Sequence, residues 1–118
     1  MTYDLTLFNK YFTAKEFEYR LNLMNPKLLY LLGVIREELG QPMRINSSFR
    51  TPEENVIAGG AKTSQHQFGK AVDIRCNDAG MAYELVRLGF KHGMTGIGVA
   101  KSFIHYDVRD GAPKLWTY

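Results

Sequence analysis

The stretch SQHQFGKAVDIRC, residues 64–76, places a histidine and an aspartate seven positions apart with a glycine between them. The residues around Asp73 are mostly apolar or β-branched, which is typical of a strand. In a strand over 71–76, Asp73 lies on the opposite face from Val72 and Ile74. A polar loop with His66 therefore leads into a strand that carries a carboxylate, and Gly69 would let the chain turn tightly between the two.

A candidate partner for these two residues lies in SFIHYDVR, residues 102–109. Alternation in a strand puts His105 and Asp107 on a polar face, while the apolar residues at 104, 106 and 108 face the core. The polar face can line a cleft, where His66, Asp73 and His105 could meet. Two imidazoles and one carboxylate suit Zn²⁺, and a fourth position left to water is typical of catalytic zinc sites.

These residues also have an ordinary structural explanation. His66 could cap a loop, Asp73 could pair with Arg75, and His105 could be a half-buried strand residue, because short His/Asp patterns arise often by chance. The spacing alone leaves both interpretations open.

The remaining pattern predicts one α+β domain over residues 1–118, a length sufficient for a single core. Runs of helix and strand without strict alternation favour a small, mostly antiparallel sheet with helices packed on it. Capping and periodicity signals predict helices over 12–21, 25–40, 51–60 and 78–93. Strands are predicted over 43–50, 71–76, 95–100, 102–110 and 113–118.

Composition excludes several classes of protein. The net charge is +3, and the lysines and arginines are scattered, so neither charge nor an aromatic-basic stripe indicates nucleic acid. Cys76 is the only cysteine, which excludes an internal disulfide, and we expect it to lie in the core. No apolar run reaches the length of a membrane span, and the N-terminal MTYDLTLFNKYF lacks the features of a signal peptide. We expect a monomer that is made in the cytoplasm and does not insert into membranes.

The stretch from residue 64 to residue 73 resembles the S-x-H-x-x-G-x-A-x-D signature of the zinc D-Ala-D-Ala carboxypeptidase and L-Ala-D-Glu endopeptidase family, which shares its fold with the Hedgehog signalling domain. The matching residues are Ser64, His66, Gly69, Ala71 and Asp73. SFIHYDVR resembles the later H-x-D block of that family, and INSSFRTPEEN resembles its S-x-x-R stretch. NKYFTAKEF is similar to the N-terminal segment of short phage and bacterial members.

The resemblance implies that one zinc ion per chain is held by His66, Asp73 and His105. It also implies that Arg50 steadies a substrate carboxylate or a developing oxyanion, for which its fork of N–H donors is suited. The alternative for Arg50 is a surface ion pair with a neighbouring glutamate, Glu53 or Glu54. Ser64 is a candidate substrate-binding residue that could support a ligand or the loop backbone, or could be a turn residue.

The chain departs from the family pattern at the position of the general base. Many members carry Asp or Glu three residues before the second histidine, where this chain has Ser102. Asp107 is the remaining candidate for a catalytic acid or base, and it could instead orient a ligand.

The resemblance implies a zinc peptidase that acts on the stem peptides of bacterial peptidoglycan, at either the L-Ala-D-Glu or the D-Ala-D-Ala bond. The alternative is a zinc-containing, non-hydrolytic module that binds wall fragments or a protein partner, which Ser102 favours. Without a signal peptide or a separate wall-binding domain, the chain is expected to be a phage or prophage product that reaches the wall through a pore or a virion.

Overall fold

The structure, a computed structural model, describes residues 2–118. Its α-helices are α1 (Thr6–Tyr11), α2 (Pro26–Leu39), α3 (Pro52–Ile57) and α4 (Ala79–His92). Short 3₁₀ helices are η1 (Ala14–Phe17), η2 (Leu21–Leu23) and η3 (Gln65–Phe68). The strands are β1 (Ile45–Ser47), β2 (Ala71–Arg75), β3 (Gly96–Val99), β4 (Phe103–Asp107) and β5 (Lys114–Thr117).

The strands form one sheet in the order β1-β2-β4-β3-β5. All neighbouring pairs are antiparallel except β3 and β5, which run parallel. The predicted α+β fold with a small, mostly antiparallel sheet is therefore confirmed. The strand predicted over 113–118 is an edge strand, as β5.

The register of the sheet aligns one residue from every strand. Ser47 pairs with Asp73, Asp73 with His105, His105 with Gly98, and Gly98 with Trp116. Residues directly opposite one another on paired strands point to the same face. This row of five residues therefore crosses one face of the sheet.

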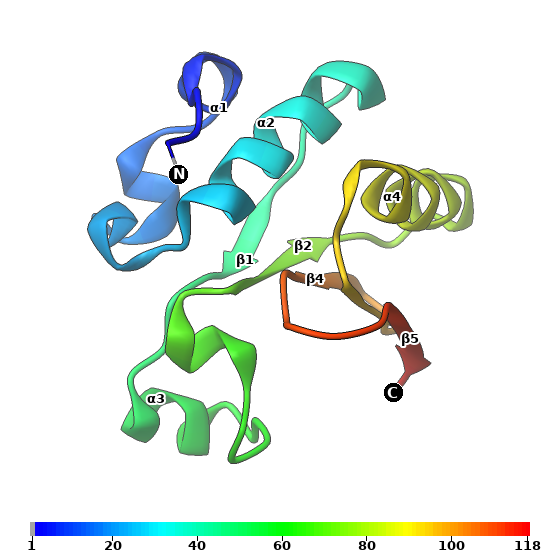
Figure 1. The fold of residues 1–118 in the computed structure, drawn as a ribbon. Helices are drawn as coiled ribbons and strands as arrows, with labels where there is room; N and C mark the ends of the chain where they lie inside the picture. The colour runs from blue at the N-terminus through cyan, green and yellow to red at the C-terminus, as the bar shows by residue number, and fades with distance from the viewer. Residues whose placement is uncertain (1) are drawn as a thin grey trace.

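The opposite face of the sheet carries the hydrophobic core. Ile74, Ile97, Ile104 and Tyr106 are almost fully buried there, and the Tyr106 hydroxyl donates to the carbonyl of Leu85. α2 packs against both α1 and α4, and α4 contacts β3 and β4. In Figure 1, α1, α2 and α4 lie to one side of the strands, while α3 lies on the other side. Burial of each large apolar side chain stabilises the fold by roughly 1.5–3 kcal/mol, and Cys76 belongs to this core, as predicted.

The helix predicted over 25–40 is confirmed together with its caps. The Asn25 side chain accepts hydrogen bonds from the backbone N–H groups of Lys27 and Leu28, and Pro26 occupies the first turn. Gly40 ends α2 in the left-handed conformation, with φ of 72°.

The helix predicted over 12–21 is wrong in type and position. The chain instead forms α1 earlier and only the 3₁₀ turn η1 after Thr13. Thr13 and Glu16 form a capping box at the start of η1, but Glu18 and Tyr19 adopt positive φ angles of 53° and 57°. Two consecutive left-handed residues end any helix at this point.

α3 is tied to the N-terminal region by an ion pair. Thr51 and Glu54 form the predicted capping box, and Arg20 donates to Glu54 over 2.7 Å. The hydrogen bond from Arg20, together with those from Thr51, holds the pKa of the Glu54 carboxyl at about 2. Glu54 is thus ionised at neutral pH and fixes the segment after Thr51 against the rest of the molecule.

No helix among residues 2–118 is long and apolar enough to cross a membrane.

A first prediction concerns the close approach of α1 and α2. A Cβ on Gly33 would lie 2.4 Å from the backbone nitrogen of Phe8, so Gly33→Ala forces the two helices apart. We expect a loss of roughly 1–3 kcal/mol from overpacking, despite the higher helix propensity of alanine. Gly80→Ala is the control, because a Cβ there meets only the Asp78 side chain at 3.6 Å or more. Urea unfolding should show destabilisation for Gly33→Ala and none for Gly80→Ala; equal stabilities would contradict the close packing.

Candidate metal centre

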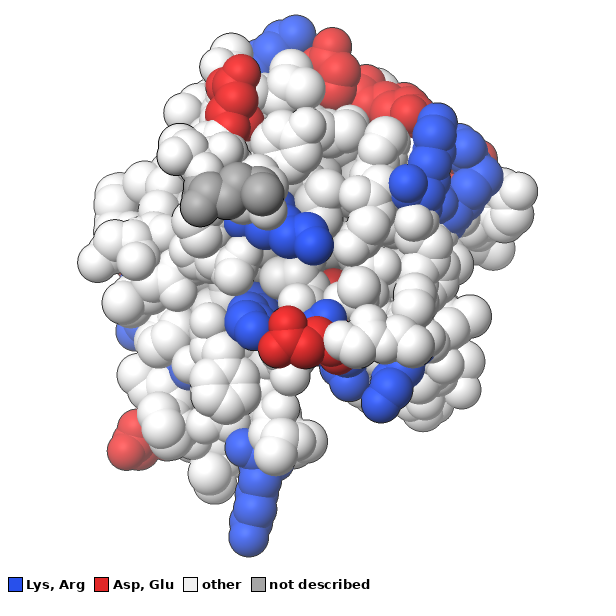
Figure 2. All heavy atoms as spheres, in the orientation of Figure 1, with Lys and Arg blue, Asp and Glu red and all other residues white. Residues whose placement is uncertain are grey.

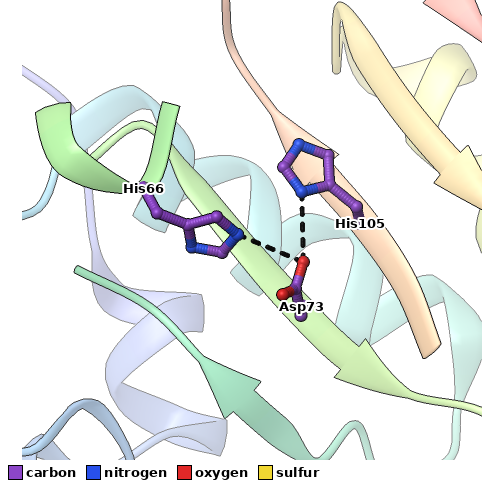
Figure 3. Close-up of side chains that lie close together, drawn as sticks. All are labelled: His66, Asp73 and His105. Atoms are coloured by element: carbon purple, nitrogen blue, oxygen red, sulfur yellow. Dashed lines mark hydrogen bonds and ion pairs between the residues drawn. The ribbon is translucent and has the colours of Figure 1, made fainter. Parts of the chain in front are cut away.

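His66, Asp73 and His105 come together on the polar face of the sheet. His66 lies in η3, Asp73 on β2 and His105 on β4, and all three are buried. One donor atom from each lies within 4.8 Å of the other two. Figure 3 shows both imidazole rings directed toward the Asp73 carboxylate. The structure thus brings together the three ligands predicted from the sequence.

Each imidazole has its outer nitrogen fixed by an acceptor. His66 Nδ1 lies 2.7 Å from the Ser48 carbonyl oxygen, and His105 Nε2 lies 2.7 Å from Asp107 Oδ2. A carbonyl and an ionised carboxylate only accept, so each of these nitrogens carries a hydrogen. His66 Nε2 and His105 Nδ1 are therefore the nitrogens turned toward Asp73 Oδ1, at 3.2 and 3.1 Å, and the ones left to bind a metal.

Asp73 is an anion at neutral pH. Burial raises the pKa of the Asp73 carboxyl, but hydrogen bonds with His105 and His66 outweigh burial and bring the pKa below its usual range. Its second oxygen, Oδ2, accepts from Arg50 over 3.2 Å, which leaves Oδ1 facing the two histidines. The expected alternative of a pair between Asp73 and Arg75 is not formed.

The loop that carries His66 is shaped by its two ends. The Ser64 side chain accepts from the backbone N–H of His66 and caps η3, while Gly69 ends it with φ of 68°. A Cβ on Gly69 would lie 2.0 Å from the carbonyl oxygen of Leu23, so only glycine fits this turn. The Gly69 carbonyl in turn accepts from Asn25 N over 2.9 Å. The predicted role of Gly69 is confirmed, and the geometry of Ser64 is that of a turn residue.

Arg50 points into the site and not toward the nearby glutamates. Its Nε donates to Ser47 Oγ over 3.1 Å, and its terminal nitrogens donate to Asn55 and Asp73 over 3.4 and 3.2 Å. Glu54 is occupied by Arg20, so the expected surface pair is not formed.

Asp107 lies behind His105 and is 0% exposed. Its oxygens accept from His105 and from Nε and a terminal nitrogen of Arg109 over 2.6–3.1 Å. Burial raises the pKa of this carboxyl, but the hydrogen bonds from His105 and Arg109 outweigh it and hold the pKa below its usual range. Asp107 thus contacts the outer nitrogen of His105 and is not part of the cavity lining.

Burial lowers the pKa of His105, but its hydrogen bonds with Asp107 and Asp73 outweigh burial and raise the pKa above its ordinary value. A carboxylate on the outer nitrogen of a ligand histidine is a recurrent arrangement in zinc proteins, where it fixes ring orientation and increases basicity.

Trp116 is a site residue that the sequence analysis missed. Its ring centroid lies 5.3 Å from that of His105, and the Arg109 guanidinium carbon lies 4.7 Å from the same ring. Phe103 and Tyr118 also line the cavity, with ring centroids 5.2 Å apart. The sequence showed only that Trp116 lies in a predicted edge strand with other aromatic residues. It did not show which strand pairs with that edge strand, and so did not place Trp116 beside His105.

The cluster opens into a cavity of about 480 Å³. Its lining includes the segment after α3, the loop before η3, and side chains of β2, β4 and β5: residues 58–61, 63–66, Arg50, Asp73, Phe103, His105, Arg109, Trp116 and Tyr118. Among residues 2–118, Asp73 is the only carboxylate in this lining. Ser102, at the position where many relatives carry an acid, is exposed in the turn before β4 and is not part of the lining.

The donor set fits zinc. Two imidazole nitrogens and one carboxylate oxygen converge with their lone pairs toward one point, and the open cavity leaves room for a further ligand. Two of the three ligands also have the outer hydrogen-bond partners that fix such sites, Ser48 and Asp107.

Comparisons with known proteins agree with this geometry. The family model described as Peptidase M15 matches residues 7–107, which include all three cluster residues. The chain is similar to a zinc D-Ala-D-Ala carboxypeptidase from Streptomyces albus G, with 29% identity over 93 residues. The similarity covers 75% of this chain and 36% of the relative, so the chain spans about a third of that protein.

A second prediction concerns metal content. The purified protein should contain about one zinc ion per chain, because three converging protein ligands suffice for a catalytic-type site. His66→Ala and His105→Ala should each lose most of this zinc when measured by elemental analysis after dialysis. His92→Ala is the matched control, because His92 lies at the end of α4 and contacts Glu38. Equal zinc in all four proteins would show that the cluster does not bind metal.

Proposed function

Because this chain belongs to the M15 peptidase family, we propose that it is a zinc peptidase that hydrolyses peptide bonds in bacterial peptidoglycan. The observation that carries the proposal is the buried cluster of His66, Asp73 and His105 at the base of an open cavity, with an arginine beside it. Buried ionisable groups that converge in a cavity are typical of catalytic sites.

His66, Asp73 and His105 would hold the zinc ion. Zinc in such a site polarises a carbonyl oxygen and makes water nucleophilic near neutral pH. The chain's own contribution is to hold both imidazoles in the correct orientation, through Ser48 and Asp107, and to keep Asp73 ionised.

Arg50 is suited to bind an anionic group of the substrate. Three of its nitrogens each use one N–H on protein partners, and a guanidinium carries further donors that can face the cavity. The three protein contacts hold the guanidinium in place before substrate arrives, which lowers the entropic cost of binding. We propose that it binds a peptide carboxylate or the developing oxyanion.

Arg109 lines a second cavity as well as the first. This second cavity of about 430 Å³ shares Gln65 and Arg109 with the first, and its other lining residues include Lys70, Asp110 and Lys114. Cations on both sides of the metal cluster favour a peptide with carboxylates, as peptidoglycan stem peptides have. Elsewhere basic residues are dispersed, and the face drawn in Figure 2 carries lysines and arginines in several separate places.

Two bonds are candidates for cleavage. The name of the Streptomyces relative supports the D-Ala-D-Ala bond, near the end of a stem peptide. The second cavity beside Arg109 supports the L-Ala-D-Glu bond, because it offers room for substrate beyond the cavity of the metal cluster. Mass spectrometry of muropeptides after incubation with the zinc-loaded protein distinguishes the two by the fragments released. No cleavage, with binding of muropeptides retained, would instead support the non-hydrolytic module. A phage or prophage origin stays a prediction.

A third prediction concerns Arg50. Arg50→Lys should keep its zinc but lose activity by about 10-fold or more, because hydrogen bonds to charged groups contribute roughly 1.5–3 kcal/mol and one ammonium cannot replace the fork. The measurement is turnover on purified muropeptides, with zinc content determined on the same samples. Arg87→Lys, on the outer side of α4 beside Glu84, is the control. Unchanged turnover for Arg50→Lys would reject the role.

A fourth prediction separates the two roles considered for Asp107. We propose that it orients His105, so Asp107→Asn should weaken zinc binding by about 10–100-fold, and excess zinc should restore much of the rate. A general base would behave differently, with normal zinc binding and a rate about 100-fold lower that excess zinc does not restore. Asp4→Asn is the control, since Asp4 is exposed before α1, where its carboxylate accepts from Thr6, and lines neither cavity.

A further inference from the structure

Four side chains form a closed ring around one ligand of the cluster. His105 Nε2 contacts Asp107, which accepts two hydrogen bonds from Arg109 Nε and one from a terminal nitrogen of Arg109. The Arg109 guanidinium lies over the Trp116 ring, and the Trp116 ring lies against His105, which closes the ring of contacts. Each member thus touches two others. No member can move without breaking two contacts.

Two glycines of β3 make this ring possible. A Cβ on Gly96 would lie 2.2 Å from an Asp107 carboxylate oxygen, and one on Gly98 would lie 2.6 Å from Trp116 Nε1. β3 lies between β4 and β5, so any side chain on this face would separate Trp116 from His105. The absence of side chains lets the indole reach across the strand.

Trp116 is not placed there by the hydrophobic core. β5 is the edge strand, its other residues are exposed, and Trp116 is not among the core residues on the opposite face. A large aromatic residue outside the core instead covers one side of a candidate metal ligand and of the arginine that neutralises Asp107. Asp107 needs the arginine as a partner, because burying an unpaired carboxylate costs free energy.

We propose that Trp116 is a positioning residue for the metal centre, acting directly on His105 and, through Arg109, on Asp107. The indole limits rotation of the imidazole, and the cation–π contact keeps the Arg109 guanidinium on Asp107 instead of in solvent. This inference rests on the zinc site of the proposed function and assigns β5 a part in it.

The test measures metal binding apart from activity. Trp116→Ala should weaken zinc binding by about 10-fold or more in competition with a chelator, as losses of outer partners do. It should also change the visible absorption of the cobalt-loaded protein, which reports ligand geometry. Trp116→Phe keeps an aromatic face and should recover affinity to within about 3-fold of wild type, as expected if stacking carries most of the effect. Leu115→Ala is the matched control and should match wild type, because Leu115 is exposed and lies on the opposite face of β5 from Trp116.

A second variant guards against misfolding of Trp116→Ala. Gly98→Ala leaves Trp116 in the chain but displaces its indole, and should weaken zinc binding in the same direction. Since Trp116 is the only tryptophan, its fluorescence reports the displacement in this variant and should be quenched by cobalt in the wild type. Wild-type affinity and cobalt spectrum in both Trp116→Ala and Gly98→Ala would overturn the inference. Absence of zinc binding by the wild type itself would instead overturn the proposed function.

Discussion

The pairing of β2 with β4 is the constraint on which the site depends. Asp73 lies directly opposite His105 in this pair, and opposed residues in antiparallel strands have Cα atoms about 4.5–5.5 Å apart. A shift of one residue in this register would turn either side chain toward the core face. The apolar residues on the opposite face prevent such a shift, because Ile74 and Ile104, also opposed, would then be exposed to the cavity. Core packing thus enforces the geometry of the polar cluster.

The charged residues of the site are arranged symmetrically about His105. Arg50 contacts Asp73, Asp73 contacts His105, His105 contacts Asp107, and Asp107 contacts Arg109. With His105 neutral, the two carboxylates are balanced by the two arginines, so the protein part of this chain of contacts carries no net charge. A divalent cation therefore makes the whole site positive. With such a balance, a site of buried ionised residues can attract the proposed anionic peptide without an excess of basic residues on the surface.

The features that the sequence predicted are those that depend on local pattern. The face on which Asp73 and His105 lie follows from strand alternation, and the turn at Gly69 follows from its position between a polar loop and a strand. Trp116 was missed because the parallel pairing of β5 with β3 joins segments whose contact no local signal reveals. The burial of Asp107 depends on Gly96 in the neighbouring strand, which the sequence does not identify as a neighbour. The helix prediction over 12–21 was wrong because Glu18 and Tyr19 adopt a left-handed backbone, and neither residue type usually indicates one.

The order of residues along the row across the sheet has a consequence for biosynthesis. Neighbours in this row are 26, 32, 7 and 18 residues apart in the sequence, and pairings between such distant segments are slow to form. α2 lies entirely before all five residues. The metal ligands cannot meet until β4 has been synthesised and has inserted between β2 and β3. A polypeptide that ends before residue 105 therefore lacks a complete centre.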